Sequence, residues 1–145
     1  MSTMVRGILA KKGSQIHAVG PEDDVYTALE LMAEHDVGAL VVRDGNELVG
    51  IVSERDYARK VILLGRASRD TLVREVMSAP VITVSIDDTV ATCLAHMAGR
   101  RVRHLPVLAD GQLVGVVSIG DLVKAIIDAQ AFEIERLHEF ISGAP

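Results

Sequence analysis

The stretch Leu48-Val49-Gly50-Ile51-Val52-Ser53-Glu54-Arg55-Asp56 returns 65 residues later as Leu113-Val114-Gly115-Val116-Val117-Ser118-Ile119-Gly120-Asp121. The two copies can be aligned over a longer range, in which Val19–Tyr57 matches Val84–Leu122 without a gap. It indicates that one supersecondary unit was copied, because a solenoid of stacked repeats would show more copies at a shorter period. We therefore expect two copies that pack as a pseudo-twofold pair, and any site formed between them to occur in two versions.

Each copy has the pattern of a β-α-β-β-α unit. The first copy predicts strands at 15–19, 38–42 and 47–52, with helices from residue 25 and from about residue 53. The second predicts strands at 81–84, 104–108 and 113–117, with helices from residue 90 and from about residue 118. Each hairpin has Asp-Gly between apolar runs, and the acidic or hydroxyl residues at 21–24 and 86–89 can cap the helices that follow. The sequence predicts an α+β fold with α/β-type repeats, two β-α-β-β-α units in tandem.

Four segments follow from this pattern. They are a first repeat with an N-terminal lead-in at 1–64, a polar linker at 65–72, a second repeat at 73–128, and a C-terminal helical extension at 129–145. The last helix is expected to reach about residue 141 and carries an apolar stripe of Val123, Ile127, Ile134, Leu137 and Ile141. One small repeat does not need a stripe of this length, so we expect part of it to face another subunit of a homodimer.

Composition excludes several functional classes. A net charge of −5, from 15 basic and 20 acidic side chains, argues against a broad nucleic-acid surface. The single Cys93 favours a reducing compartment. No apolar run approaches membrane-spanning length, and the first ten residues lack the apolar core of a signal peptide. We expect a cytoplasmic protein with neither a membrane nor a nucleic acid as its partner.

No catalytic or metal-binding pattern is recognisable. The five histidines lack the spacing of metal ligands, and one cysteine cannot build a thiolate site. Walker motifs and nucleophile–base pairs are absent from the sequence. An enzyme would need a fused catalytic domain, for which residues 1–4 and 142–145 leave no room. We therefore expect no enzymatic activity, no metal and no catalytic cofactor.

At Gly50–Asp56 and Gly115–Asp121, together with Arg103–Val107, the chain resembles the CBS (cystathionine-β-synthase) domain family. The resemblance covers about residues 5–128, and the whole chain looks like a stand-alone bacterial CBS pair, or Bateman module. It implies two repeats that pack through their sheets, pairs that dimerise into a flat disc, and adenosine-ligand sites in clefts between repeats. It also implies a module without chemistry of its own.

Ser53 and Asp56 lie three residues apart at a predicted helix start, as do Ser118 and Asp121. These residues can simply cap the helix and complement its dipole. Backbone N–H groups at a helix start also suit phosphate, and a carboxylate there can accept hydrogen bonds from both ribose hydroxyls. The resemblance assigns the ribose to Asp56 and Asp121, with Ser53 and Ser118 as neighbouring hydroxyls.

By the family pattern each site combines a lead strand, which lines an adenine slot, with the helix start of the other repeat. The resemblance implies a site B of Met77, Val81, Ile82, Ser53, Arg55, Asp56, Arg103 and His104. It implies a site A of Lys12, Ile16, Ala18, Ser118 and Asp121. Apolar residues suit a purine face, although the same strands could be ordinary core.

The two copies differ most before the second strand, where Arg103 and His104 stand in place of Gly38 and Ala39. The regulatory γ-subunit of AMP-activated kinases, which shares this pattern, uses a His-Arg pair at this place to contact nucleotide phosphates. The order here is reversed, which leaves open which side chain points inward. Arginine suits phosphate through its bidentate fork, whereas the neighbouring 100–101 pair is expected at an exposed helix end.

Two functions from different classes remain. The first is a regulatory, energy-sensing module that binds AMP, ADP, ATP or NAD and passes its state to an unknown partner protein. The second is a dimeric interaction scaffold whose nucleotide sites are vestigial. The paired Ser and Asp residues favour the sensor.

Overall fold

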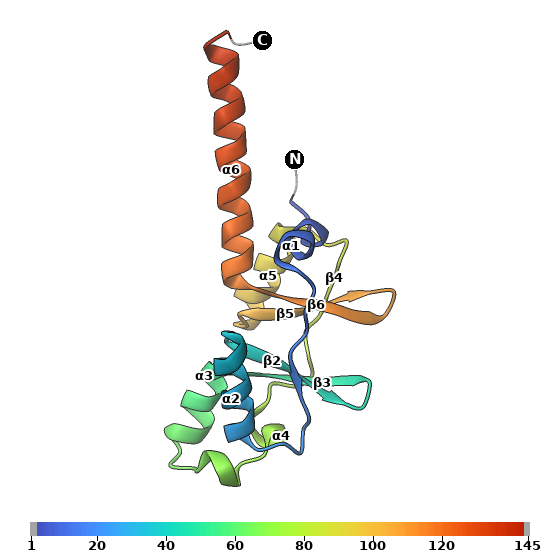
Figure 1. The fold of residues 1–145 in the computed structure, drawn as a ribbon, viewed down its shortest axis with the longest axis vertical. Coiled ribbons are helices and arrows are strands. Elements are labelled where there is room, and N and C mark those ends of the chain that lie inside the picture. The colour runs from blue at the N-terminus through green and yellow to red at the C-terminus, as the bar shows by residue number, and fades with distance from the viewer. Residues whose placement is uncertain (1–2, 144–145) are drawn as a thin grey trace. The chain divides into compact units, whose positions relative to one another are not determined.

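The structure, a computed structural model that describes residues 3–143, contains two three-stranded sheets, each in a unit of its own (Figure 1). The sheet-1 unit consists of residues 15–83, and the sheet-2 unit joins residues 3–14 to residues 84–143. Residues 1, 2, 144 and 145 of the predicted segments 1–64 and 129–145 lie outside the described residues.

The sheet-1 unit has the strand order β1-β2-β3, with β1 parallel and β3 antiparallel to the central strand β2. Its strands are β1 (Ala18–Val19), β2 (Ala39–Asp44) and β3 (Glu47–Ser53). Its helices are α2 (Val25–His35), α3 (Glu54–Tyr57), the π-helix η1 (Ala58–Ile62), the 3₁₀ turn η2 (Ser68–Asp70) and α4 (Val73–Val76).

The sheet-2 unit repeats this topology with the order β4-β5-β6. Its elements are α1 (Val5–Lys12), β4 (Val84–Ser85), α5 (Val90–Arg100), β5 (His104–Ala109), β6 (Gln112–Ser118) and α6 (Ile119–Ile141). The hairpin registers are equivalent, since Ala39 pairs with Ser53 in one unit and His104 with Ser118 in the other. The predicted α+β fold of two tandem repeats is therefore confirmed.

Buried apolar residues recur at the repeat spacing, which explains why the two units fold alike. The buried pairs are Val19 and Val84, Val25 and Val90, Ala28 and Cys93, Met32 and Met97, Leu40 and Leu105, Val42 and Val107, and Val52 and Val117. On α2 and α5 these positions follow the three- and four-residue spacing of one helix face. Cys93, predicted to lie in a helix, is buried in α5, and this burial raises the pKa of its thiol.

Side-chain caps fix the starts of the two long repeat helices, as the sequence predicts. The Asp24 carboxylate accepts a hydrogen bond from the Thr27 backbone N–H at 2.7 Å, and the Thr89 hydroxyl accepts one from Thr92 N–H at 3.1 Å. The Thr27 hydrogen bond lowers the pKa of Asp24, because it favours the charged carboxylate. Both caps satisfy backbone donors that have no partner within the helix.

The predicted hairpins form, although their turns differ. Gly45 has a φ of 63° at the first central position, where a type II′ turn needs glycine. In the second hairpin both central residues have positive φ, 50° at Asp110 and 76° at Gly111, as in a type I′ turn. The Asp-Gly pair thus lies one residue further along in the second copy, and each turn type follows from where its glycine falls.

The lead strands are shorter than predicted. Instead of 15–19 and 81–84, the strands cover Ala18–Val19 and Val84–Ser85, so Ile16, Val81 and Ile82 lie outside any strand. Pro80 has no N–H to donate to a ladder. The segment before it pairs elsewhere, because Ser78 and Ile51 exchange backbone hydrogen bonds of 2.8 and 3.2 Å.

Each lead-in segment packs with the sheet of the other repeat. In the sheet-2 unit, Val5 N–H donates to Asp88 O at 3.0 Å. In the sheet-1 unit, Val73 N–H donates to Asp23 O at 2.8 Å.

The helix α6 reaches Ile141 as predicted. Among residues 3–143 no helix is long and apolar enough to cross a membrane.

Candidate functional site

Ser53 and Asp56 form a reciprocal cap at the start of α3. The Asp56 carboxylate accepts a hydrogen bond from Ser53 N–H at 3.0 Å, and the Ser53 hydroxyl accepts one from Asp56 N–H at 3.2 Å. Ser118 and Asp121 do the same at the start of α6, at 2.8 and 3.1 Å. The capping role expected for these residues is confirmed, and it holds each carboxylate in a fixed position beside the end of a strand.

Lys60 places a positive charge on the Asp56 carboxylate. Its ammonium lies 3.2 Å from Asp56 Oδ1 and donates a hydrogen bond to Val76 O at 2.8 Å. Lys60 therefore links the start of α3 to the end of α4. The residue belongs to the π-helix η1, a rare element that often marks functional sites. Lys60 is not among the residues expected from the sequence, although its four-residue spacing from Asp56 is a signal for an ion pair on a helix.

Lys12, a predicted residue of site A, places an ammonium on Asp121. Its Nζ lies 2.6 Å from Asp121 Oδ2 and donates to Val116 O at 3.0 Å. Burial alone would raise the pKa of Asp121, but the hydrogen bonds from Lys12 and the Ser118 backbone outweigh it and lower that pKa below its usual value. Asp121 thus stays a charged acceptor. The structure brings together Lys12, Ser118 and Asp121, three of the residues that the resemblance assigns to site A.

The two ammonium groups reach equivalent carboxylates from different elements. Position 125, which corresponds to Lys60 in the repeat, is an alanine within the regular helix α6. Lys12 instead ends α1, an eight-residue helix, whereas the matching lead-in helix α4 has four residues. The longer α1 therefore ends in a lysine, Lys12, which provides the ammonium that α6 lacks at position 125.

Met77, a residue assigned to site B, lies directly against β3. A Cβ atom built on Gly50 would lie 2.5 Å from Met77 Sδ, so only glycine allows this approach without a shift. The other unit repeats the arrangement with Gly115 and Leu9, where a Cβ would lie 2.8 Å from Leu9 Cδ2. The two glycines of the repeated stretch thus make room for the lead-in helices.

The remaining predicted residues are distributed over both units. Val81 and Ile82 are half-buried and share the sheet-1 unit with Met77, Ser53, Arg55 and Asp56. Ile16 and Ala18 also belong to the sheet-1 unit, whereas Ser118 and Asp121 belong to the other. Arg103 and His104 belong to the sheet-2 unit, where Arg103 O accepts a hydrogen bond from Ile119 N–H at 2.9 Å. Their assignment to the Asp56 carboxylate stays a prediction, as does that of Ile16 and Ala18 to Asp121.

His17, between two predicted site A residues, stacks on His35 with ring centroids 3.8 Å apart. Burial lowers the pKa of His17, and the neighbouring His35 lowers it further, while Glu34 opposes the change. A proton on His17 is therefore disfavoured in the folded chain.

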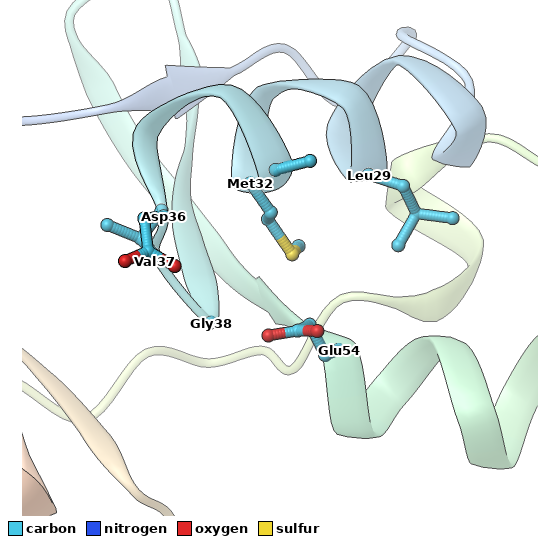
Figure 2. A pocket seen from close by; sticks show the side chains of 7 residues that line it. Leu29, Met32, Asp36, Val37, Gly38 and Glu54 are labelled. Carbon is cyan, nitrogen blue, oxygen red and sulfur yellow. The ribbon is translucent and has the colours of Figure 1, made fainter.

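A surface hollow of about 240 Å³ lies beside Glu54 in the sheet-1 unit (Figure 2). Figure 2 shows Leu29 and Met32 extending from α2 toward Glu54, with Asp36 at the end of the helix. The carboxylates of Asp36 and Glu54 would repel phosphate, and neither Ser53 nor Asp56 lines the hollow. Its chemistry does not suit a nucleotide.

In the described part of the chain, no group of three or more His, Cys, Asp or Glu side chains could hold a metal ion. The chemical features that recur in both units are thus a capped carboxylate, an ammonium beside it and an apolar lead-in segment packed on the adjoining strand.

Comparisons with known proteins identify the family of the two repeats. Residues 5–62 and 73–128 each match the CBS domain family. A solved structure from Burkholderia ambifaria, described as a candidate signal-transduction protein with CBS domains, is 49% identical; the match covers 88% of this chain and 96% of that one, with a TM-score of 0.84. The mitochondrial CBS domain-containing protein CBSX3 of Arabidopsis thaliana is 38% identical over 98% of this chain and 73% of its own length. A hexameric CBS-CP12 protein from bloom-forming cyanobacteria is 26% identical over 85% of this chain and 71% of that one, with a TM-score of 0.77.

Proposed function

Because the chain belongs to the CBS domain family, as a pair of tandem CBS repeats, we propose that it is a regulatory module that binds an adenosine-containing nucleotide. The ligand classes are AMP, ADP, ATP and NAD, and the bound state is passed to a partner protein. The observation that carries the proposal is the pairing of Asp56 with Lys60 and of Asp121 with Lys12.

The carboxylates supply the ribose contact in this proposal. Each is held by its serine, so little conformational freedom is lost when ribose hydroxyls donate to it. Capping alone requires the Ser and Asp pair but no lysine. An ion pair between partly exposed groups contributes about 0–1 kcal/mol, so stability is a weak reason for an ammonium at both positions.

The lysines supply charge near the phosphate. An ammonium about 3 Å from the ribose-binding carboxylate can turn to a phosphate oxygen on the same nucleotide, since lysine acts as a mobile point charge. Arg103 and His104 are proposed as further phosphate ligands, with arginine favoured because of its bidentate fork. Lys60 is an addition to the residues expected from the sequence.

Apolar residues of the lead segments supply the adenine contact. In the sheet-1 unit Met77 packs on β3, while Val81 and Ile82 follow it as half-buried residues. A thioether and branched aliphatic side chains suit a purine face. For the second site Ile16 and Ala18 are proposed in the same role.

Signal transduction without catalysis is the activity we propose. A relative is described as a candidate signal-transduction protein, and the recurring carboxylates and ammonium groups suit ligand binding but do not form a nucleophile–base pair. The partner protein is not specified by these residues. We further propose a homodimer as the working unit, because α6 leaves most of its apolar residues exposed and at least one relative is described as hexameric.

The second candidate is a dimeric interaction scaffold with vestigial nucleotide sites. One observation favours it: the caps and the lysine ion pairs already give both carboxylates partners within the chain. A thermal-shift series with AMP, ADP, ATP, NAD and adenosine separates the two. Ligand at about a hundred times its dissociation constant stabilises the fold by roughly 2.7 kcal/mol, so a sensor's melting temperature rises. A scaffold's melting temperature stays constant with every ligand at millimolar concentration.

A further inference from the structure

The second half of α6 is exposed on every side. All residues from Gln130 to Gly143 are exposed, including Ile134 at 67%, Leu137 at 61% and Ile141 at 81%. In Figure 1, α6 continues well past α5 and the β5–β6 hairpin of its own unit. An isolated helix of this length is marginal in water, and its exposed apolar side chains call for a covering surface.

Ile127, Ile134 and Ile141 do not continue the face that packs on the sheet-2 unit. That face is formed by buried Leu122 and by half-buried Ala125, Ile126 and Ala129, and it ends there. Residues on an α-helix are about 100° apart, which places Ile127 and Ile134 roughly 100° or more around the axis from Leu122. The helix therefore carries two apolar faces, one used within its unit and one directed elsewhere.

The second face has the spacing of a coiled coil. Ile127, Ile134 and Ile141 recur every seven residues, and a second series, four residues before each of these, has the same period. The second series is Val123, Gln130 and Leu137. These two series are the a and d positions of a heptad, whose side chains pack against a like helix.

We propose that α6 pairs in parallel with α6 of a second copy, as a two-stranded coiled coil along this heptad seam. This inference rests on the homodimer of the proposed function and specifies its geometry. Isoleucine at a with leucine at d, as at Ile134 and Leu137, favours two parallel strands.

Gln130 distinguishes the two orientations. In a parallel pair it faces Gln130 of the second copy, and the two amides can hydrogen-bond to each other. In an antiparallel pair that sets a against d, Gln130 faces Ile134 of the second copy, which leaves an amide against an apolar side chain. An unsatisfied buried amide is costly, so the parallel pair is favoured.

The charges at the flanks agree with this choice. Glu133 at g faces His138 of the second copy at e in the parallel pair, where imidazole can donate to the carboxylate. In the antiparallel pair Glu133 faces Glu133 of the second copy and the two repel each other. The end of α6 also has more acidic than basic side chains, which argues against an anionic lipid surface as the occupant of this face.

Cysteine cross-linking tests the orientation. Native Cys93 is buried and its thiol pKa is raised, so the wild type serves as the uncross-linked control. Leu137→Cys places two d-position thiols face to face in the parallel pair, within disulfide reach. We expect Leu137→Cys alone to form a covalent dimer under mild oxidation. A dimer cross-linked only when Leu137→Cys is mixed with Ile127→Cys would overturn the parallel geometry.

Sedimentation separates failure of the geometry from failure of the homodimer. Ile134→Lys puts a charge at the centre of the seam and should raise the dimer dissociation constant at least a hundredfold. Its control, Glu135→Lys, changes an exposed residue outside the seam and should leave that constant within about twofold. A wild type that stays monomeric at high micromolar concentration refutes the homodimer itself. A dimeric wild type that Ile134→Lys does not weaken refutes only the coiled coil, and nucleotide binding is measured independently of either result.

Discussion

The Lys12 ammonium lies 2.6 Å from the Asp121 carboxylate, although the two residues are far apart in sequence and belong to different ends of the chain. The pair exists because the N-terminal helix α1 packs with the second sheet. Lys60 and Asp56 form the corresponding pair within four residues. Both copies thus have an ammonium beside the capping aspartate, but the lysine comes from a different element in each copy.

Replacing Lys12 should lower the free energy of unfolding more at neutral pH than at acidic pH. The lowered pKa of Asp121 means that the ion pair contributes above the ordinary carboxyl pKa and is lost as the pH falls through the lowered value. Lys12→Met should therefore cost up to about 1 kcal/mol at pH 7, because both groups are partly exposed, and less at pH 3. Urea unfolding at both pH values measures the difference. Lys11→Met, at the exposed neighbour, is the control and should show no such dependence; equal losses in both variants would contradict the account.

His17 should make the fold less stable as the solution becomes acidic. Its pKa is lowered in the folded chain, so the unfolded chain binds the proton more readily and stability falls as the pH drops below about 6.5. The His17→Gln variant lacks the pH dependence that His17 gives to the free energy of unfolding. The other histidines are present in both proteins, so their contributions cancel when the variant is compared with the wild type. Unfolding free energies at pH 8 and pH 5 should show the wild type losing more stability than the variant. A larger loss in the variant would reverse the predicted sign.

The two glycines against the lead-in helices should resist substitution. A Cβ on Gly50 would lie 2.5 Å from Met77 Sδ and 3.2 Å from the Ser78 carbonyl oxygen. Gly50→Ala should therefore destabilise by about 1–3 kcal/mol, as overpacking does, since a flexible methionine can give way but the backbone cannot. Gly99→Ala on α5 is the control, because nothing lies within 4 Å and alanine favours a helix by up to about 1 kcal/mol. A higher melting temperature for Gly50→Ala than for Gly99→Ala would show that the close approach of Met77 to Gly50 does not make the substitution destabilising.

Arg103 should affect phosphate recognition and leave adenosine recognition intact. A charge-assisted hydrogen bond contributes about 1.5–3 kcal/mol, which corresponds to roughly one to two decades of affinity. Arg103→Ala should weaken AMP by that amount and leave adenosine nearly unchanged, as measured by calorimetry. Arg100→Ala, at the exposed end of α5, is the control. An unchanged ratio of AMP to adenosine affinity in Arg103→Ala would remove the proposed phosphate role.

The fold could be predicted from the sequence because the spacing of apolar residues within each copy and the similarity between the two copies indicated the same elements. Val25, Ala28 and Met32 show the helical spacing, the second copy repeats it, and Asp24 caps the helix that they begin. A shared register could be inferred from the same duplication. The lead strands were predicted too long, since apolar residues such as Val81 and Ile82 look the same whether or not a neighbouring strand is there to pair with them.

The site was predictable only in part. Ser53 and Asp56 indicate a helix start by themselves, and both residues form its cap. Met77 packs against Gly50 of β3, while its assignment to an adenine slot stays a prediction. The spacing of Lys60 from Asp56 allows their ion pair to be expected, but the sequence does not signal the π-helix from which the Lys60 ammonium also reaches the Val76 carbonyl. Whether Arg103 acts with Asp56 depends on contacts between units, which repeat spacing alone does not determine.

Titration calorimetry of AMP against the wild type, Asp56→Ala and Asp24→Ala tests the central claim most directly. Both substitutions remove a helix-capping aspartate, but only Asp56 is proposed to hold ribose. We expect the wild type and Asp24→Ala to bind AMP alike, and Asp56→Ala to lose about one to two decades of affinity at its site. A wild type that binds no AMP, or an Asp56→Ala variant that binds as Asp24→Ala does, would contradict the proposed nucleotide site.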